Sequence, residues 1–269
     1  MRGVLRELER FEHRVLGAFR CVDATTLAPI DDPLVVSAQG ARFLRNRSGL
    51  YVVRSWTGLS AHEEAFEQPP AAPPIGSELL EVEVRDPGER YLPRRVRLAL
   101  PRDPSPARAA EADSLFRAAD VPMYPAASAP LGANWVELRV TVRETASGDA
   151  LGGALLRVVA GARVLARGLT DWRGEGLVPV AGVPVTTWST EPGAVVVTEI
   201  AGSLECYFDA ATGTRTSAAE VRAAAGPATP PLPDPEALEA GRAALPQSIT
   251  PLVLAAGRSV AVAISLGVP

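Results

Sequence analysis

Residues 135–142 read Trp-Val-Glu-Leu-Arg-Val-Thr-Val, and residues 170–174 read Thr-Asp-Trp-Arg-Gly. Apolar and polar side chains alternate in the first stretch, which is the period of a β-strand with one buried face. In the second stretch the aspartate can accept hydrogen bonds from its own backbone, and the glycine permits a positive φ. The two stretches therefore predict a half-buried strand followed, further along the chain, by a tight turn between strands.

Strands and turns of the same kind fill most of the chain. The turn Asn46-Arg47-Ser48-Gly49 precedes an apolar strand at 50–53, and residues 95–100 alternate strictly. Further strands are expected at 155–159 and 177–180, and a closing hairpin at 252–266, with Val260, Val262 and Ile264 facing inward. The prediction is a mainly β chain of two immunoglobulin/transthyretin-like antiparallel sandwiches with a short N-terminal helix and a Pro-rich connector.

Shifts in pattern divide the chain into four parts. Residues 1–17 form an N-terminal helical arm, because Leu5, Leu8 and Phe11 recur at helical spacing and predict a helix over about residues 4–16. Residues 18–104 form the first sandwich, and residues 105–132 form a Pro-rich connector with room for a short helix at 107–119. Residues 133–269 form the second sandwich, with a long excursion at 202–248 that carries short helices near 217–225 and 235–244.

Composition excludes several classes of protein. The chain of 269 residues has a formal net charge of −4 and contains no lysine, so Schiff-base, phosphate-loop and lysine isopeptide chemistry are excluded. The acidic balance argues against nucleic acid as a partner. Cys21 and Cys206 are far apart in sequence and predict two buried free thiols. The charged N-terminus lacks the apolar core of a signal peptide and no run of 18 apolar residues occurs, so we expect no membrane span and a cytoplasmic location.

The second module resembles the carboxypeptidase regulatory-like, or transthyretin-like, sandwich family over about residues 134–182. The residues that carry the resemblance are Val140-Thr141-Val142, Ser147-Gly148, Gly153-Ala154-Leu155 and the turn at 170–174. The two modules are also predicted to share one plan of turn, apolar strand, Asx–Gly turn and apolar strand, with residues 46–53 and 171–180 as corresponding parts. The family serves as a spacer, adaptor or assembly module, so the resemblance implies a fold without implying an activity.

The first module is similar to accessory proteins encoded with phage-tail-like contractile injection systems. The similar segments are residues 22–25, 29–30, 46–53, 84–87, 91–94 and 100–104. This resemblance implies a structural part of such a particle at its baseplate or cap end. The implied partners are the sheath, tube, baseplate or cap proteins of the particle.

Residues for catalysis or metal binding are scarce. The two histidines, His13 and His62, do not have the spacing of a zinc motif, and no Gly-x-Ser-x-Gly elbow occurs. Cys21 lies in an apolar strand and is interpreted as a core residue. We therefore predict no catalytic, cofactor-binding or metal-binding residues, and a protein that is not an enzyme.

A cluster of arginines is the feature most suited to binding. Arg90, Arg94, Arg95, Arg97 and Arg102 fall within a short span, with Arg95 and Arg97 on the outward face of a strand. Three interpretations stay open: a solvated sheet face, an ion-pairing contact with an acidic protein, and nucleic-acid binding. The candidate interface combines these arginines with the apolar residues of the N-terminal arm named above. The expected function is a structural or adaptor subunit of a large assembly; the alternative is a surface-binding module for carbohydrate or protein.

Overall fold

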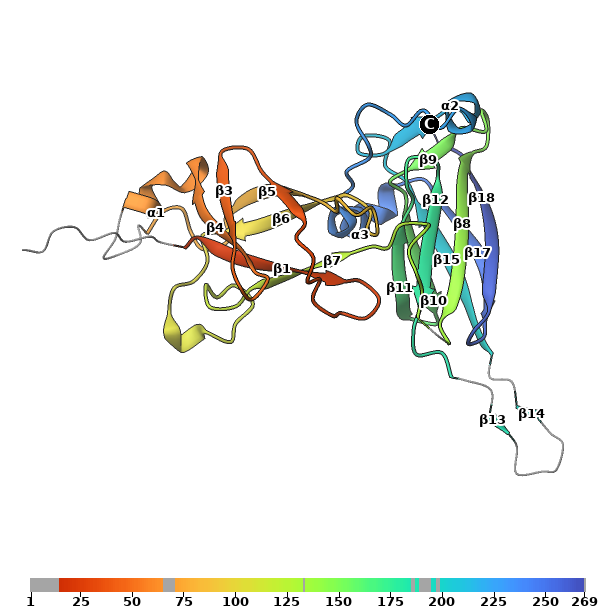
Figure 1. The fold of residues 1–269 in the computed structure, drawn as a ribbon, viewed down its shortest axis with the longest axis horizontal. Coiled ribbons are helices and arrows are strands. Elements are labelled where there is room, and N and C mark those ends of the chain that lie inside the picture. The colour runs from red at the N-terminus through yellow and green to blue at the C-terminus, as the bar shows by residue number, and fades with distance from the viewer. Residues whose placement is uncertain are drawn as a thin grey trace, which may run out of the picture. The chain divides into compact units, whose positions relative to one another are not determined.

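The computed structural model describes residues 15–64, 71–132, 134–184, 187–188, 195–196 and 199–268. The chain is mainly β, with several antiparallel sheets and few, short helices, which confirms the predicted fold class (Figure 1). Among the described residues, none of the helices is both long and apolar enough to cross a membrane. The expected helix at 4–16 falls mostly outside the described residues; Val15 and Leu16, at its end, are not helical.

The elements up to residue 123 are short. They are β1 (Gly17–Asp23), β2 (Val35–Ser37), β3 (Ala41–Arg45), β4 (Tyr51–Trp56), η1 (Thr57–Leu59), α1 (Ser60–Glu64), β5 (Glu78–Arg85), β6 (Arg94–Leu100), η2 (Pro106–Arg108) and β7 (Ala119–Met123). One sheet has the order β3-β4-β1-β7 and another the order β2-β5-β6. The predicted connector therefore contains a strand, β7, which tolerates Pro122 because it lies at the edge of its sheet. The helix expected at 107–119 is reduced to the single turn η2.

Contacts divide the chain into two compact units that do not follow the order of the sequence. The first unit falls within residues 1–20, 37–82 and 97–120, and the second within residues 21–36, 83–96 and 121–269. In the first unit, Phe19 stacks on Tyr51 with ring centres 5.3 Å apart and meets Phe43 edge to face. The second unit contains the whole of the predicted second sandwich and, in addition, residues 21–36 and 83–96 of the predicted first one.

The second unit contains a sandwich of two sheets. Its strands are β8 (Val136–Glu144), β9 (Ala150–Gly152), β10 (Leu155–Ala160), β11 (Arg163–Leu169), β12 (Glu175–Val180), β15 (Ile200–Tyr207), β16 (Thr214–Thr216), β17 (Gln247–Leu254) and β18 (Ser259–Leu266). One sheet has the order β11-β10-β15-β17, and the other has the order β12-β8-β9-β16 with β18 on β8. A separate two-residue pair, β13 (Thr187–Trp188) and β14 (Val195–Val196), lies between β12 and β15 in sequence.

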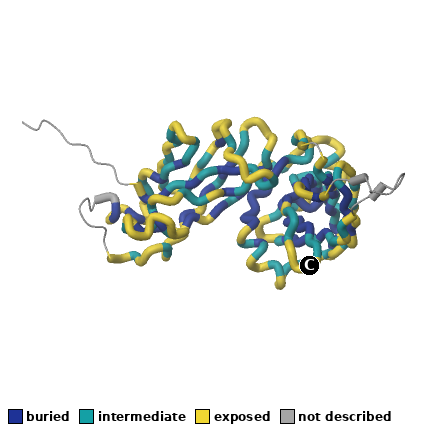
Figure 2. Tube along the Cα trace, turned by 90° about the horizontal axis from the view of Figure 1, so that it is seen from below, coloured by how far each residue is buried: buried dark blue, intermediate teal, exposed yellow. Residues whose placement is uncertain are grey.

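The core of this sandwich is aliphatic, and it follows the alternation that the sequence predicts. Val136, Leu138, Val140 and Val142 of β8 are each at most 2% exposed, whereas the residues between them are partly or fully exposed. Figure 2 shows buried positions interleaved with exposed ones along the strands. The inward row on β18 is confirmed as well, since Ile264 is 3% exposed and its neighbours in the row pack against the same core. Such burial of apolar surface is the main favourable term in folding.

The predicted C-terminal hairpin is wrong. β18 pairs in parallel with β8, with Ser259 opposite Glu137 and Leu266 opposite Glu144, while β17 pairs with β15 in the other sheet. The turn at 255–258 therefore crosses from one sheet to the other and does not join hydrogen-bonded neighbours. The short helices expected in the excursion are confirmed as α2 (Ala218–Arg222) and α3 (Pro235–Gly241), the latter followed by η3 (Arg242–Ala244).

The corresponding turns of the two predicted modules have the same hydrogen bonds. In one, the Asn46 side chain accepts from the N–H groups two and four residues on; in the other, the Asp171 side chain does the same, at 2.8–3.0 Å. Gly49 and Gly174 both have a positive φ, of 76° and 73°. The strands around the turns differ, however. β3 and β4 pair within one sheet, whereas β11 and β12 belong to different sheets, so the likeness is local.

Candidate functional site: a groove beside Trp172

A groove of about 630 Å³ opens on the second unit beside Trp172. Its lining comes from four segments, which lie within residues 85–93, 126–128, 171–173 and 226–230. We call it the Trp172 groove. Its size falls within the range of roughly 300–1,000 Å³ found for ligand sites. Every segment that lines it belongs to the second unit.

The turn that presents Trp172 is fixed by two polar side chains. The Thr170 hydroxyl is buried, accepts from the Ala154 N–H at 2.9 Å and donates to the Leu151 carbonyl at 2.7 Å. Asp171 accepts two backbone N–H bonds across the turn and a third hydrogen bond from the Arg173 guanidinium at 2.9 Å. These bonds leave little freedom to the backbone of residue 172. The fixed backbone of residue 172 thus places the Trp172 indole on one side of the groove.

A similar turn, at Asp86, supplies another part of the groove lining. Asp86 accepts from the N–H groups of Gly88, Arg90 and Tyr91 at 2.8–3.2 Å, and Glu89 takes the positive φ that glycine has in the other two turns. The Tyr91 hydroxyl donates to Asp23 at 3.0 Å. Burial, followed by this hydrogen bond, raises the pKa of Tyr91 to about 12, so its phenol stays protonated well above neutral pH.

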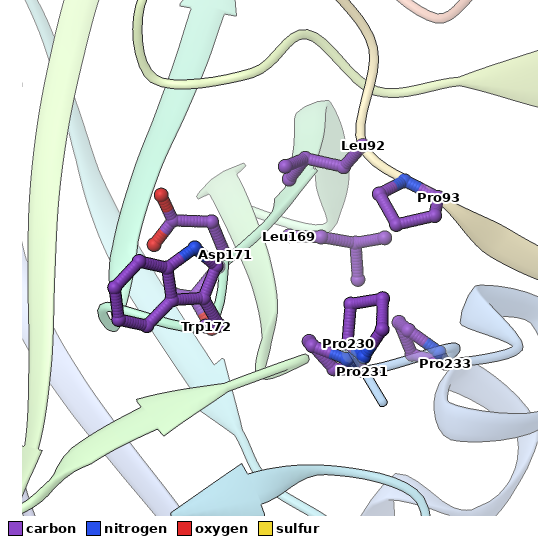
Figure 3. Close-up of a pocket in the computed structure, with 9 residues that line it drawn as sticks. Leu92, Pro93, Leu169, Asp171, Trp172, Pro230, Pro231 and Pro233 are labelled. Atoms are coloured by element: carbon purple, nitrogen blue, oxygen red, sulfur yellow. The ribbon is translucent and has the colours of Figure 1, made fainter. Parts of the chain in front are cut away.

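An apolar pocket of about 60 Å³ adjoins the groove and shares Trp172 with it. Figure 3 shows Trp172 on one side of this pocket, Leu92 and Pro93 above it, and the ring of Pro230 across from the indole. Pro231 and Pro233, on the same proline-rich segment, complete the wall on that side. The chain's own proline-rich segment, residues 226–233, is therefore packed along the aromatic side of the site.

The proline-rich segment is held in place at its end. The Arg95 N–H donates to the Pro233 carbonyl at 2.9 Å, and Asp234 then caps α3 by accepting from Glu236 and Ala237 N–H groups. α3 is fixed in turn by ion pairs of its two glutamates. Glu236 pairs with Arg94, and Glu239 pairs with Arg157 at 2.9 Å and with Arg167 at 3.4 Å.

The exposed arginines around the groove are both in ion pairs: Arg85 pairs with Glu83 at 3.4 Å, and Arg173 pairs with Asp171 at 2.8 Å and with Glu175 at 3.2 Å. The carboxylates of Asp86 and Asp171 are 3% and 11% exposed and are occupied by the turns that they close. Arg85 and Arg173 keep 36% and 39% of their side chains exposed, and Glu89 is exposed beside them. The lining contains neither histidine nor cysteine. Such a lining suits binding through apolar contact and charged hydrogen bonds.

The five arginines of the sequence-based candidate interface do not form one free surface. Arg95 pairs with Glu83 at 3.9 Å and Arg97 pairs with Glu81 at 3.3 Å, both across strands β5 and β6. Arg90 pairs with Asp32 at 2.5 Å. Arg102 donates to the backbone carbonyls of Ser114 and Arg117 at 3.0 and 3.1 Å, and to that of Ala112.

Arg94 is the clearest departure from the expected surface. Its side chain is 0% exposed, donates to the Pro122 carbonyl at 2.7 Å and lies 5.9 Å from the centre of the Tyr124 ring. Because Val96 and Leu98 face inward on β6, the period of two places Arg94 on the inward side too. Arg94 therefore has no surface to offer a partner. It anchors α3 through Glu236 instead.

Other residues singled out in the sequence are placed as follows. The arm residues Leu5, Leu8 and Phe11 lie outside the described residues, as does His13. His62 is 4% exposed on α1. Both cysteines are free and buried, as predicted, and burial raises the pKa of Cys206 to about 12.

The sequence treated Trp172 only as part of a turn and so missed its role in a groove. A large aromatic residue in an otherwise polar turn, flanked by Asp171 and Arg173, was the available signal. Comparison with protein-family models, with curated protein sequences and with solved structures gave no match.

Proposed function

We propose that the chain is a non-catalytic structural or adaptor subunit of a large protein assembly. The observation that carries the proposal is the Trp172 groove, which combines aromatic, proline and charged side chains in a preformed hollow. Interfaces between proteins favour tryptophan, tyrosine and arginine in this way. The carboxylates in the lining with the least exposure, Asp86 and Asp171, close turns and are not arranged as an acid–base pair.

The best candidate for the assembly is a phage-tail-like contractile injection system, with this chain at its baseplate or cap end. The support is the resemblance of the segments within 22–104 to accessory proteins of such particles, together with the spacer and adaptor use of carboxypeptidase regulatory-like modules. Assembly in the cytoplasm, with sheath, tube, baseplate or cap proteins as partners, belongs to the same proposal.

The alternative function is a surface-binding module for carbohydrate or protein. The half-buried aromatic residues Trp172 and Tyr91 at the groove favour it, since aromatic rings also stack against sugars. The two functions differ in what accompanies the chain in the cell. An assembly subunit is found in a particle, and a surface-binding module is found on its target.

The test is isolation of the chain from its source cells under gentle conditions. An epitope-tagged chain is expected to sediment with a particle that contains sheath and tube proteins, visible by negative-stain electron microscopy. The variant Leu8→Asp in the arm, and charge reversal at Arg95 and Arg97, examine the interface expected from sequence. A tagged chain that sediments only as a free monomer would refute the assembly proposal.

A further inference from the structure

We propose that the free edge of strand β18 (Ser259–Leu266) pairs with the same strand of a second copy of this chain, antiparallel and about a two-fold axis at Val262. The sheet that contains β8 and β18 then continues into the same sheet of the second copy. The inference does not depend on the assembly proposed above. It assigns a partner, a second copy, to a strand that does not line the Trp172 groove.

Strand β18 lies at the end of its sheet. It pairs on one side with β8, and among the described residues no strand pairs with its other side (Figure 1). The Glu137 N–H donates to the Arg258 carbonyl at 2.9 Å and the Thr145 N–H donates to the Leu266 carbonyl at 3.0 Å, so the backbone groups of even-numbered residues face β8. These groups alternate in direction along a strand. The odd-numbered residues therefore direct their N–H and C=O groups to the free side: Ser259, Ala261, Ala263 and Ser265.

The other outer strands of the sandwich have features that prevent pairing. Charges, prolines, bulges and short length all protect the edge of a sheet. Strand β11 has exposed Arg163 and Arg167 and a bulge against β10, β12 has Pro179, β16 is three residues long, and β17 has Pro251. In contrast, β18 is eight residues long, keeps a continuous register with β8, and contains neither a charged residue nor a proline. Its edge is therefore suited to accept a further strand.

The side chains of β18 are complementary to those of a second β18. Val260 and Val262 face the core but stay half-buried, whereas Ile264 is 3% exposed. In a pair about Val262, that residue meets its own counterpart and Val260 meets Ile264, so the half-buried valines gain an apolar cover. The outward pairs are all small: Ala261 with Ala263, and Ser259 with Ser265. Such self-complementarity on both faces is what a two-fold interface requires.

Charges beside the strand select this register. On the outward face, Ser259 lies next to Glu137 of β8, and Ser265 lies next to Arg143. The proposed pairing places Glu137 of one copy in the same row as Arg143 of the other, with two serines between them and about 14 Å between their backbones. An axis one residue away in either direction would instead put Arg139 in a row with an arginine of the other copy. The opposite charges favour a second copy as the occupant, and Val262 as the centre.

Sedimentation velocity of the purified full chain measures the association. The chain is expected to form a dimer with a Kd below about 100 µM, as suits a small interface built on backbone hydrogen bonds. Ala261→Pro removes an N–H from the free side without removing a bond to β8, and it should weaken the dimer at least about tenfold. Ala261→Ser keeps the N–H at the same position and should leave the Kd unchanged. Circular dichroism establishes that both variants are folded.

Cysteine crosslinking tests the register independently. Val262→Cys places two thiols opposite each other on the axis, in a non-hydrogen-bonded pair with Cα atoms about 4.5 Å apart, which a disulfide can span. Val260→Cys is the matched control, because its side chain is half-buried on the same face and its counterpart lies about 13 Å further along the other strand. Mild oxidation should link Val262→Cys chains and leave Val260→Cys chains unlinked. The wild-type chain gives the background, since Cys21 and Cys206 are buried.

Three results would overturn the inference. They are a chain that stays monomeric at about 1 mM, a dimer that Ala261→Pro does not weaken, and equal crosslinking of the two cysteine variants. A monomeric chain that nevertheless sediments with a particle overturns this inference and leaves the assembly proposal standing. A dimer with the expected crosslink that is found outside any particle supports this inference and refutes the assembly proposal.

Discussion

Substitution of Gly174 by alanine tests the turn that holds Trp172. Gly174 has a φ of 73°, a conformation that costs an alanine about 1–2 kcal/mol, part of which is returned because alanine restricts the unfolded chain. The added Cβ would also lie 2.4 Å from the Val142 carbonyl oxygen and 3.1 Å from the Leu151 nitrogen. Both atoms belong to backbone in the sandwich and cannot rotate away.

The backbone must therefore shift, and a hydrogen bond is at risk when it does. The Val142 N–H donates to the Gly174 carbonyl at 2.8 Å, next to the point of contact. Loss of one buried hydrogen bond costs about 1–3 kcal/mol. Together with the backbone strain, Gly174→Ala is expected to lower the free energy of unfolding by about 3 kcal/mol. For a unit of this size that corresponds to a fall in Tm of about 6–12 °C.

Gly148→Ala is the matched control. Gly148 lies in the same unit, has a φ of 74°, and has no atom within 4 Å of an added Cβ. Gly148→Ala should therefore lower the free energy of unfolding only through backbone strain, by about 1 kcal/mol or less. Differential scanning calorimetry and urea unfolding measure both variants on the same transition. If the two variants lose equal stability, the Val142 backbone moves without cost, and the argument that this turn is rigid is refuted.

Four further outcomes follow from the structure. Thr170→Val should lower the free energy of unfolding, measured in urea, by about 2–3 kcal/mol, because two buried backbone groups lose their hydrogen-bond partner. Thr170→Ser keeps the hydroxyl and should lower it by under about 1 kcal/mol. Equal losses would mean that packing, not hydrogen bonding, matters at this position. Arg94→Gln should lower the free energy of unfolding by about 2–4 kcal/mol, because the Arg94 side chain is buried. Arg97→Gln should lower it by under about 1 kcal/mol, because Arg97 forms a surface pair. Calorimetry that ranks the two variants the other way would contradict the burial of Arg94. Cys206 should not react with a thiol reagent at about pH 8 until the protein unfolds, because burial raises its pKa to about 12, and rapid labelling of the native chain would disprove this. Burial also raises the pKa of Tyr124 to about 12. The contribution of the protonated phenol to stability is therefore complete below about pH 10 and lost as pH rises toward 12. An absorbance titration in which all tyrosines of the folded chain ionise near pH 10 would argue against this shift.

Local features of the fold could be predicted because they depend on neighbouring residues. The strand at Val136–Glu144 needs only its own alternation, and the Asx turns at Asn46 and Asp171 need only an acceptor and a glycine at fixed spacing. The helix at Pro235–Gly241 begins with Asp234 as N-cap and proline in its first turn, both strong start signals. For these elements, side-chain chemistry and local geometry agree.

The pairing of strands was not accessible in the same way. The stretch 252–266 has two apolar strands and a glycine-containing turn, a pattern that a hairpin and a crossing between sheets share. The choice is made by β8, which offers a free side to Ser259–Leu266 from far away in sequence. β7 was missed for a related reason. Its proline argues against a strand in general, and only its place at an edge makes the proline acceptable.

The candidate site shows the same division. The sequence identified the turn at Thr170–Gly174, and it placed Arg95 and Arg97 on an outward face. It had no means of bringing residues 85–93, 126–128, 171–173 and 226–230 to one groove, because that depends on the packing of four separate segments. The buried position of Arg94 was within reach, since it shares the inward period of Val96 and Leu98.

The parallel pairing of β8 with β18 has a consequence for synthesis on the ribosome. β8 is the first strand of the sandwich to be made, yet the strand that covers one of its sides is not available until Leu266 has been made. Until then β8 has backbone N–H and C=O groups unpaired along that side, which is the condition under which strands pair with the wrong partner. Contacts between residues so distant in sequence also slow folding. Nascent chains should consequently be prone to aggregate from the emergence of β8 until β18 has paired with it.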